Sequence, residues 1–141
     1  NDSFQALWID IRFLKKKVVI CRILYRPHNS TENFLTEYIE EATEDTAAGK
    51  NLRLLGDCNL CLQRIETCHY SHEFLFASQS CYHIPTINKP KPVHRASVSL
   101  INNIFVNNPD QVLVNGNLIT DVSDHVSQFC IVGSTIKTKA N

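Results

Sequence analysis

Apolar and polar positions alternate along the chain in a pattern that predicts short strands separated by two helices. Apolar runs over residues 6–11, 18–25, 52–55, 98–106, 111–114 and 126–132 predict the strands. The run over residues 18–25 is almost entirely apolar and β-branched, with Arg22 as the exception. We therefore expect a central strand that is buried on both faces. It ends at Pro27, because proline cannot continue a hydrogen-bonded ladder.

The segment after this strand has apolar residues at helical spacing. One face of the segment is apolar, with Phe34, Leu35, Tyr38, Ile39 and Ala42, and the other carries Glu37, Glu40, Glu41 and Glu44. Capping by Asn29, Ser30 or Thr31 and a stop at Gly49 are expected. A second helix is predicted over residues 66–80, with Phe74, Leu75 and Phe76 toward the core. The order of elements predicts one layered α/β or α+β domain over residues 1–141.

Composition and charge fit a globular protein and give no sign of a nucleic-acid partner. The 141 residues are 43% hydrophobic and 20% charged, and Lys plus Arg equals Asp plus Glu at 14 each. A local cationic patch would still suffice for binding, and its candidates are residues 15–17, Arg22, Arg26, Lys89, Lys91 and Arg95. We see no signal peptide and no apolar run long enough for a bilayer, so we expect an intracellular protein without a membrane partner.

The cysteines are interpreted as free thiols in a reducing compartment. There are six, and Cys21 and Cys130 stand within apolar strands as small buried hydrophobes. An alternative is a zinc-binding module built from Cys58, Cys61, Cys68, His69 and His72. The regular spacing of a second zinc knuckle is not evident after Cys61.

Two polar clusters adjoin apolar strands and carry the candidate chemistry. Asp57 and Asn59 follow LRLL, and Asp124 and His125 precede VSQFCIV. Asp57 offers a general base, and His125 a group that titrates near neutral pH. Asp124 is an oxygen ligand of the kind Mg²⁺ prefers. Together they suit phosphate-ester hydrolysis, although from spacing alone a turn residue or a surface pair is the commoner explanation of each cluster.

The order and wording of four motifs narrow this interpretation. The chain contains YRPHNS at residues 25–30, LLGDCN at 54–59, SLINNIF at 99–105 and ITDVSDH at 119–125. It resembles the endonuclease/exonuclease/phosphatase superfamily, and especially the endonuclease domain of non-LTR retrotransposons. Those proteins read like YRPPNS, LLGDFN, SLIDNIF and ITDISDH in the same order. The resemblance extends over nearly the whole chain.

The resemblance implies a four-layered α/β sandwich whose site lies at one end of two packed sheets. Implied catalytic residues are Tyr25, Asp57, Asn59, Asn102, Asp124 and His125, with Asn29, Ser99 and Ser123 binding substrate. Asp124 would contact the metal, which is Mg²⁺ or Mn²⁺. The implied activity is DNA nicking by the endonuclease of a retrotransposon. A reverse transcriptase domain and a nuclear location are expected for the full-length protein.

Three departures from the family pattern qualify the expected activity. In the family, the metal-binding Glu lies in a segment N-terminal to the part that this chain resembles. We therefore expect a chain that lacks the N-terminal part of the domain. Asn102 replaces the Asp that orients the catalytic His, and Cys58 replaces a Phe. We therefore expect the isolated chain to nick DNA weakly or not at all. A non-catalytic remnant, and a phosphatase or exonuclease of the same fold, remain the alternatives.

Overall fold

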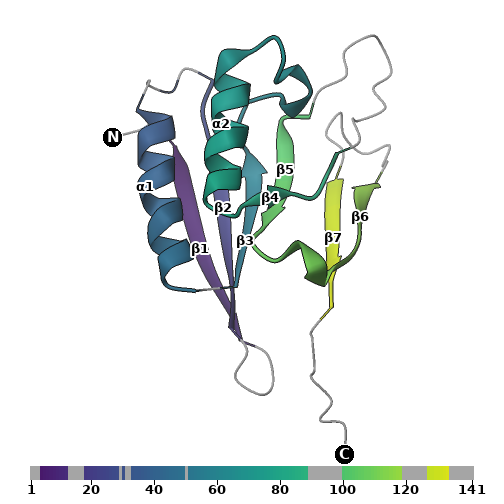
Figure 1. Cartoon of the computed structure of the whole chain (residues 1–141). Helices are drawn as coiled ribbons and strands as arrows, with labels where there is room; N and C mark the ends of the chain where they lie inside the picture. Colours follow the sequence, from purple (N-terminus) through teal and green to yellow (C-terminus); the bar gives the residue numbers. More distant parts are fainter. Residues whose placement is uncertain are drawn as a thin grey trace, which may run out of the picture.

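A five-stranded mixed sheet forms the centre of the structure (Figure 1). This computed structural model describes residues 4–12, 18–28, 30, 33–49, 51–88, 100–118 and 127–133. The strands are β1 (Gln5–Arg12), β2 (Val18–Tyr25), β3 (Leu52–Asp57), β4 (Ile84–Pro85) and β5 (Asn102–Val106), in the order β1-β2-β3-β5-β4. β2 and β3 are parallel, and the other pairs are antiparallel. A mixed α/β architecture is therefore confirmed.

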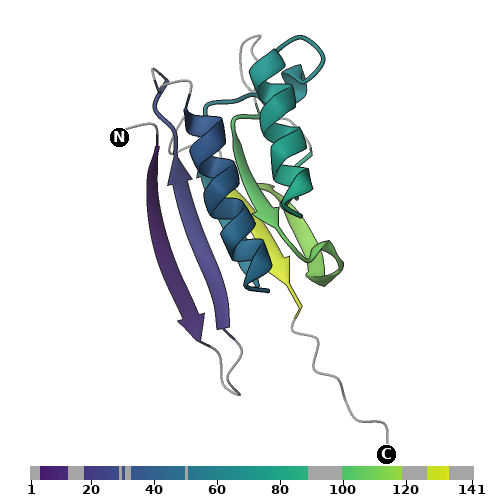
Figure 2. The same ribbon diagram turned by 60° about the vertical axis from the view of Figure 1, so that its left-hand side comes forward.

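Two helices cover one face of this sheet (Figures 1 and 2). They are α1 (Phe34–Ala47), which connects β2 to β3, and α2 (His69–Ser80), which follows a short 3-10 helix, η1 (Leu62–Arg64). The apolar core lies between helices and sheet, and it includes Leu24, Phe34, Tyr38, Leu54, Phe74 and Phe105. Within it, the Tyr38 hydroxyl lies 3.1 Å from both Ser78 Oγ and His83 Nδ1. Burial lowers the pKa of His83 to about 4, so this imidazole is neutral at pH 7.

The opposite face of the sheet is covered at one end by a hairpin of β6 (Val112–Leu118) and β7 (Ser127–Val132), which follows a second 3-10 helix, η2 (Pro109–Gln111). In Figure 2 the hairpin lies behind the sheet and the helices lie in front. Leu7, Ile23, Leu55 and Ile104 form one row of paired residues across β1, β2, β3 and β5. Exposure falls along this row from 58% at Leu7 and 41% at Ile23 to 6% at Ile104. The hairpin therefore shields β5 and leaves β1 and β2 open on this face.

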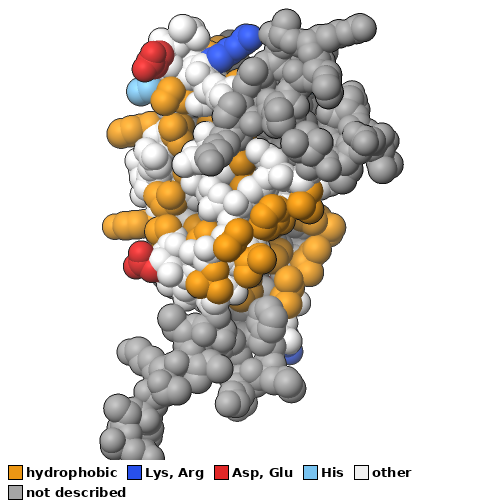
Figure 3. All heavy atoms as spheres, turned by 90° about the vertical axis from the view of Figure 1, so that its right-hand side faces the viewer, with side chains coloured by type: hydrophobic (Ala, Val, Ile, Leu, Met, Phe, Trp, Pro, Cys, Tyr) orange, Lys and Arg blue, Asp and Glu red, His pale blue; other side chains and the backbone are white. Residues whose placement is uncertain are grey.

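The outer side of the hairpin is also apolar. Figure 3 shows hydrophobic side chains gathered on this side of the molecule. The exposed apolar residues of the hairpin as a whole are Leu113, Val114, Leu118, Ile131 and Val132. The described part of the chain thus has a helix layer, a sheet and a hairpin layer. The sheet and the hairpin both expose apolar surface.

Gly56 allows β2 and β3 to approach closely. Its φ is +154°, and a Cβ added there would lie 1.8 Å from the carbonyl oxygen of Leu24. Any side chain at this position would collide with the backbone of β2. This glycine therefore sets the path of β3 into Asp57.

Several details of the sequence prediction need correction. β2 is not buried on both faces, because Ile23 is 41% exposed on the face opposite the helices. α1 begins after Asn33, not after residues 29–31, whereas the predicted end at Gly49 is confirmed by its positive φ. α2 begins at His69, because η1 and a turn occupy residues 62–67. Phe76 points outward and is 67% exposed.

The burial of two cysteines also needs correction. Cys21 and Cys130 are only partly buried, so they are not the fully buried hydrophobes that were expected. In the part of the chain described, no helix has the length and apolarity to cross a membrane.

Candidate active site at the ends of the central strands

Tyr25, Asp57 and Asn102 lie side by side where three neighbouring strands of the sheet, β2, β3 and β5, end or begin. The parallel pairing of β2 and β3 places Tyr25 opposite Asp57, and the antiparallel pairing of β3 and β5 places Asp57 opposite Asn102. Directly paired residues project from the same face of a sheet. Three residues from three different sequence motifs therefore form one row on the face that the hairpin partly covers.

The turn after β3 is held by hydrogen bonds to the end of β2. The backbone N–H of Arg26 donates to the carbonyl oxygen of Asp57 at 2.9 Å, and the Asn59 Nδ2 donates to the Arg26 carbonyl at 2.5 Å. The Asn59 N–H also donates to Asp57 Oδ1 at 2.9 Å. Asn59 has a φ of +50°, a conformation that asparagine tolerates better than most residues. Asn59 therefore fixes both the turn and the Asp57 carboxylate.

A small open pocket of about 250 Å³ lies beside this row. It is lined by Leu55, Gly56, Asp57, Asn102, Asn103, Ile104 and Gln128. Gln128 Nε2 donates to the carbonyl oxygen of Asn102 at 3.0 Å and lies 3.3 Å from Asn117 Oδ1. Asn102 Oδ1 is buried and has no hydrogen-bond partner among the described residues. The described lining of the pocket thus includes the Asp57 carboxylate and an amide oxygen that can still accept a hydrogen bond.

Gln128 is a residue of the pocket that sequence reasoning missed. It is a polar position within the otherwise apolar segment VSQFCIV, directly after the cluster of Asp124 and His125. That polar interruption was the available signal. Asn103, its neighbour in the pocket, is occupied elsewhere, because its amide exchanges two hydrogen bonds with the backbone of Ile87 at 2.8 and 3.1 Å.

Cys58, the residue that departs from the motif, packs as a hydrophobe. It is 4% exposed and belongs to the core between helices and sheet. Burial, and next the nearby Asp57 carboxylate, raise the pKa of its thiol to about 12. The thiol at this position is therefore neutral and faces the core.

The residues named for the zinc alternative do not come together as a metal site. Cys58 faces the core, and His69 pairs with Glu73 at 3.0 Å on the surface of α2. In the described ranges, no group of three or more His, Cys, Asp or Glu side chains is placed to hold a metal ion. The structure therefore gives the zinc interpretation no support.

The remaining predicted site residues fall outside the part of the chain that the structure describes. These are Asn29, Ser99, Ser123, Asp124 and His125. Among the predicted basic residues, Arg22 is not a surface cation, because it is 1% exposed and donates to Glu41. Arg26 is partly buried, with its guanidinium 5.1 Å from the centre of the Phe34 ring. The other basic candidates also fall outside the described residues.

In comparisons with known proteins, neither a family model nor a curated protein sequence matches this chain.

Proposed function

We propose that this chain is part of a metal-dependent phosphodiesterase that nicks DNA, of the type found in non-LTR retrotransposons. The observation that carries the proposal is the row of Tyr25, Asp57 and Asn102. These residues come from the motifs YRPHNS, LLGDCN and SLINNIF, and nothing in their sequence spacing requires them to meet. Their pairing at one sheet edge, beside an open pocket, is the arrangement that a shared catalytic role needs.

Asp57 is the proposed general base. Its Oδ1 accepts the Asn59 N–H, which fixes the carboxylate and leaves Oδ2 to take a proton from water. Tyr25 is 46% exposed beside it, so its hydroxyl is free to donate to a phosphate oxygen. His125 is proposed to stabilise charge on that phosphate, with the unpartnered Oδ1 of Asn102 as the acceptor for its imidazole N–H.

The donor types in the pocket suit a hard cation. Carboxylate and amide oxygens are ligands of Mg²⁺ and Mn²⁺, and Mg²⁺ is often held by one or two carboxylates plus substrate phosphates. Asp124 is the proposed carboxylate ligand, and Asp57, the carboxylate among the described pocket residues, remains the proposed base. A bound metal would supply charge neutralisation at the scissile phosphate and its leaving oxygen.

The same proposal extends to the fold and to the partners. The hairpin of β6 and β7 would be one part of the second sheet of a four-layered sandwich. The open apolar face of β1 and β2 would then receive the rest of that sheet. DNA is the proposed substrate, with a reverse transcriptase domain in the same protein and action in the nucleus.

A non-catalytic remnant is the second candidate, and the observation that favours it is Asn102. An amide behind an imidazole cannot stabilise the imidazolium by charge. Such a remnant would fold as described here and would bind DNA without cleaving it.

Plasmid nicking tests the proposal. The test uses the 141-residue chain and a chimera in which the Glu-bearing upstream segment of an active family member precedes it. We expect weak or no nicking by the chain alone and Mg²⁺-dependent nicking by the chimera, abolished by chelator. A soluble, folded chimera that leaves supercoiled plasmid intact at all Mg²⁺ and Mn²⁺ concentrations would favour the remnant.

A further inference from the structure

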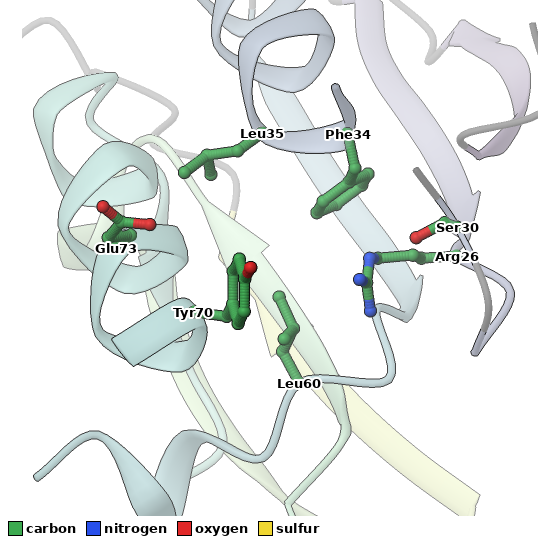
Figure 4. Close-up of a pocket in the computed structure, with 7 residues that line it drawn as sticks. All are labelled: Arg26, Ser30, Phe34, Leu35, Leu60, Tyr70 and Glu73. Atoms are coloured by element: carbon green, nitrogen blue, oxygen red, sulfur yellow. The ribbon is translucent and has the colours of Figure 1, made fainter. Parts of the chain in front are cut away.

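A second cavity lies on the helix side of the sheet, next to the turn at residues 57–59 (Figure 4). Its volume is about 230 Å³, and it opens between the first turns of α1 and α2. The residues that line it are Arg26, Ser30, Phe34, Leu35, Leu60, Tyr70 and Glu73. It is smaller than the pockets that hold drug-sized ligands, so it suits a single ring system.

The walls of the cavity offer flat apolar surface. Phe34 and Leu60 are buried and form its floor, whereas the Tyr70 ring is 58% exposed and forms a wall on α2. The Arg26 guanidinium lies 5.1 Å from the centre of the Phe34 ring. Figure 4 shows Tyr70 facing the space between Leu60 and Phe34, with Arg26 and Ser30 at the far end. Aromatic rings and a stacked guanidinium are the surfaces on which nucleic-acid bases stack.

The end formed by Arg26 and Ser30 is polar and incompletely satisfied. Arg26 Nε and Ser30 Oγ are both buried, and neither has a hydrogen-bond partner among the described residues. Buried polar groups without partners are costly, so their side chains gain when an acceptor enters the cavity. At the other end, the Glu73 carboxylate is engaged by His69.

The cavity is tied directly to the candidate active site. Arg26 follows Tyr25 and hydrogen-bonds through its backbone to both Asp57 and Asn59. Leu60 follows Asn59 in the chain and packs into the core beneath the cavity. A nucleic-acid strand crossing the ends of β2 and β3 would therefore meet the row of Tyr25 and Asp57 on one face and this cavity on the other.

We propose that this cavity binds one unpaired nucleobase of the DNA substrate, stacked on Tyr70, with its carbonyl groups facing Arg26 and Ser30. This inference rests on the proposed function for the identity of the ligand. It specifies that the substrate presents an unpaired or extruded base close to the cleavage position. An aromatic side chain of a partner peptide is the competing occupant.

Binding of labelled oligonucleotides in EDTA tests the inference without requiring cleavage. Fluorescence anisotropy compares a ten-residue oligothymidylate with an oligomer of the same length and charge that lacks all bases. We expect the 141-residue chain to bind the thymidylate about 5- to 100-fold more tightly, the range that one base stacked on an aromatic ring produces. Equal affinity for the two oligomers would overturn the inference and leave a peptide as the occupant.

Three variants locate the effect. Tyr70→Ala should remove most of the preference, and Tyr70→Phe should keep it, because stacking needs the ring and not the hydroxyl. Phe76→Ala is the matched control, since Phe76 is an exposed aromatic residue of the same helix that does not line the cavity. A preference that survives Tyr70→Ala, or that Phe76→Ala reduces equally, would place base stacking elsewhere.

Nicking activity and base preference are separate readouts with separate consequences. If the chimera nicks DNA while the base preference is absent, the phosphodiesterase proposal stands and the base site is wrong. If the preference depends on Tyr70 while no protein nicks, the site binds a base in a protein that is not a nuclease.

Discussion

Asp57 and Asn102 are directly paired across β3 and β5, so a carboxylate and an amide stand side by side at the edge of the sheet. The Asn102 Oδ1 is buried without a partner among the described residues, while its backbone carbonyl is held by Gln128. This pairing places a hydrogen-bond acceptor next to the proposed base. The Asn102 amide can orient an imidazole by accepting its N–H. It cannot supply the negative charge that a carboxylate would add.

Asn102→Asp should raise nicking by the chimera about 10- to 100-fold, up to the level of about 10²-fold at which general acid–base assistance usually begins. A carboxylate would orient the His125 imidazole and stabilise its protonated form. Initial rates of plasmid nicking measure the gain. The gain should vanish when His125→Ala is added, because the carboxylate acts through the imidazole. An unchanged rate, or an equal gain without His125, would show that position 102 does not serve the histidine.

Gly56→Ala should prevent stable folding. The added Cβ would lie 1.8 Å from the Leu24 carbonyl oxygen, and β2 and β3 would have to separate. We expect a loss of more than about 4 kcal/mol, in the range reserved for severe backbone or packing defects. Gly49→Ala is the control, because a Cβ there meets no atom within 4 Å and only the positive φ of +61° opposes it, at about 1 kcal/mol. Urea unfolding of both variants should separate them, and similar stabilities would contradict the geometry.

His83 should make stability fall as pH decreases from about 6.5 to 4. Burial holds the pKa of the folded imidazole near 4, below its unfolded value near 6.5. The unfolded chain therefore binds more protons in this window, so stability rises with pH through it and is complete above pH 6.5. Lowering pH from 7 to 4.5 should cost about 2 to 3 kcal/mol through this residue.

Urea unfolding at the two pH values checks this effect. His83→Asn keeps a polar atom near Tyr38 and should make the stability less dependent on pH. His72→Asn, at an exposed position, serves as the control and should leave the pH dependence as in the native chain. Equal pH dependence in all three proteins would rule out His83 as the source.

The open face of β1 and β2 should make the isolated chain self-associate. Leu7, Ile9, Ile11 and Ile23 are all exposed, and β1 is an edge strand of the described sheet. Sedimentation velocity at rising concentration should show oligomers. Leu7→Lys should shift the distribution toward monomer, whereas Phe76→Lys, on the helix side, should not. A monomeric native chain with a cooperative melt would contradict this expectation.

The sequence predicted the local elements well where one periodicity dominated. α1 and β3 followed from the spacing of Phe34, Tyr38 and Ala42 and from the short run before Asp57. The exposure of β2 was not predictable, because both of its faces are apolar and burial depends on what covers them. The early start assigned to α2 failed because η1 occupies part of a segment that has no strong periodicity of its own.

The sequence pointed to residues of the candidate site but not to the contacts between them. The motif order pointed to Tyr25, Asp57 and Asn102, and strand pairing brought all three together. Two contacts depend on tertiary structure that no local pattern contains. These are the bond from Asn59 to the Arg26 carbonyl and the bond from Gln128 to Asn102.

The nicking rate of the chimera with Asp57→Asn tests the proposed general-base role of Asp57 most directly. The amide can still accept the Asn59 N–H, so the turn should persist, while the proton acceptor is lost. We predict a fall in rate of about 10²- to 10⁴-fold with unchanged circular dichroism and melting temperature. Asp110→Asn, at an exposed position in η2, should leave the rate unchanged. A folded Asp57→Asn chimera that nicks plasmid as fast as its parent would contradict the account.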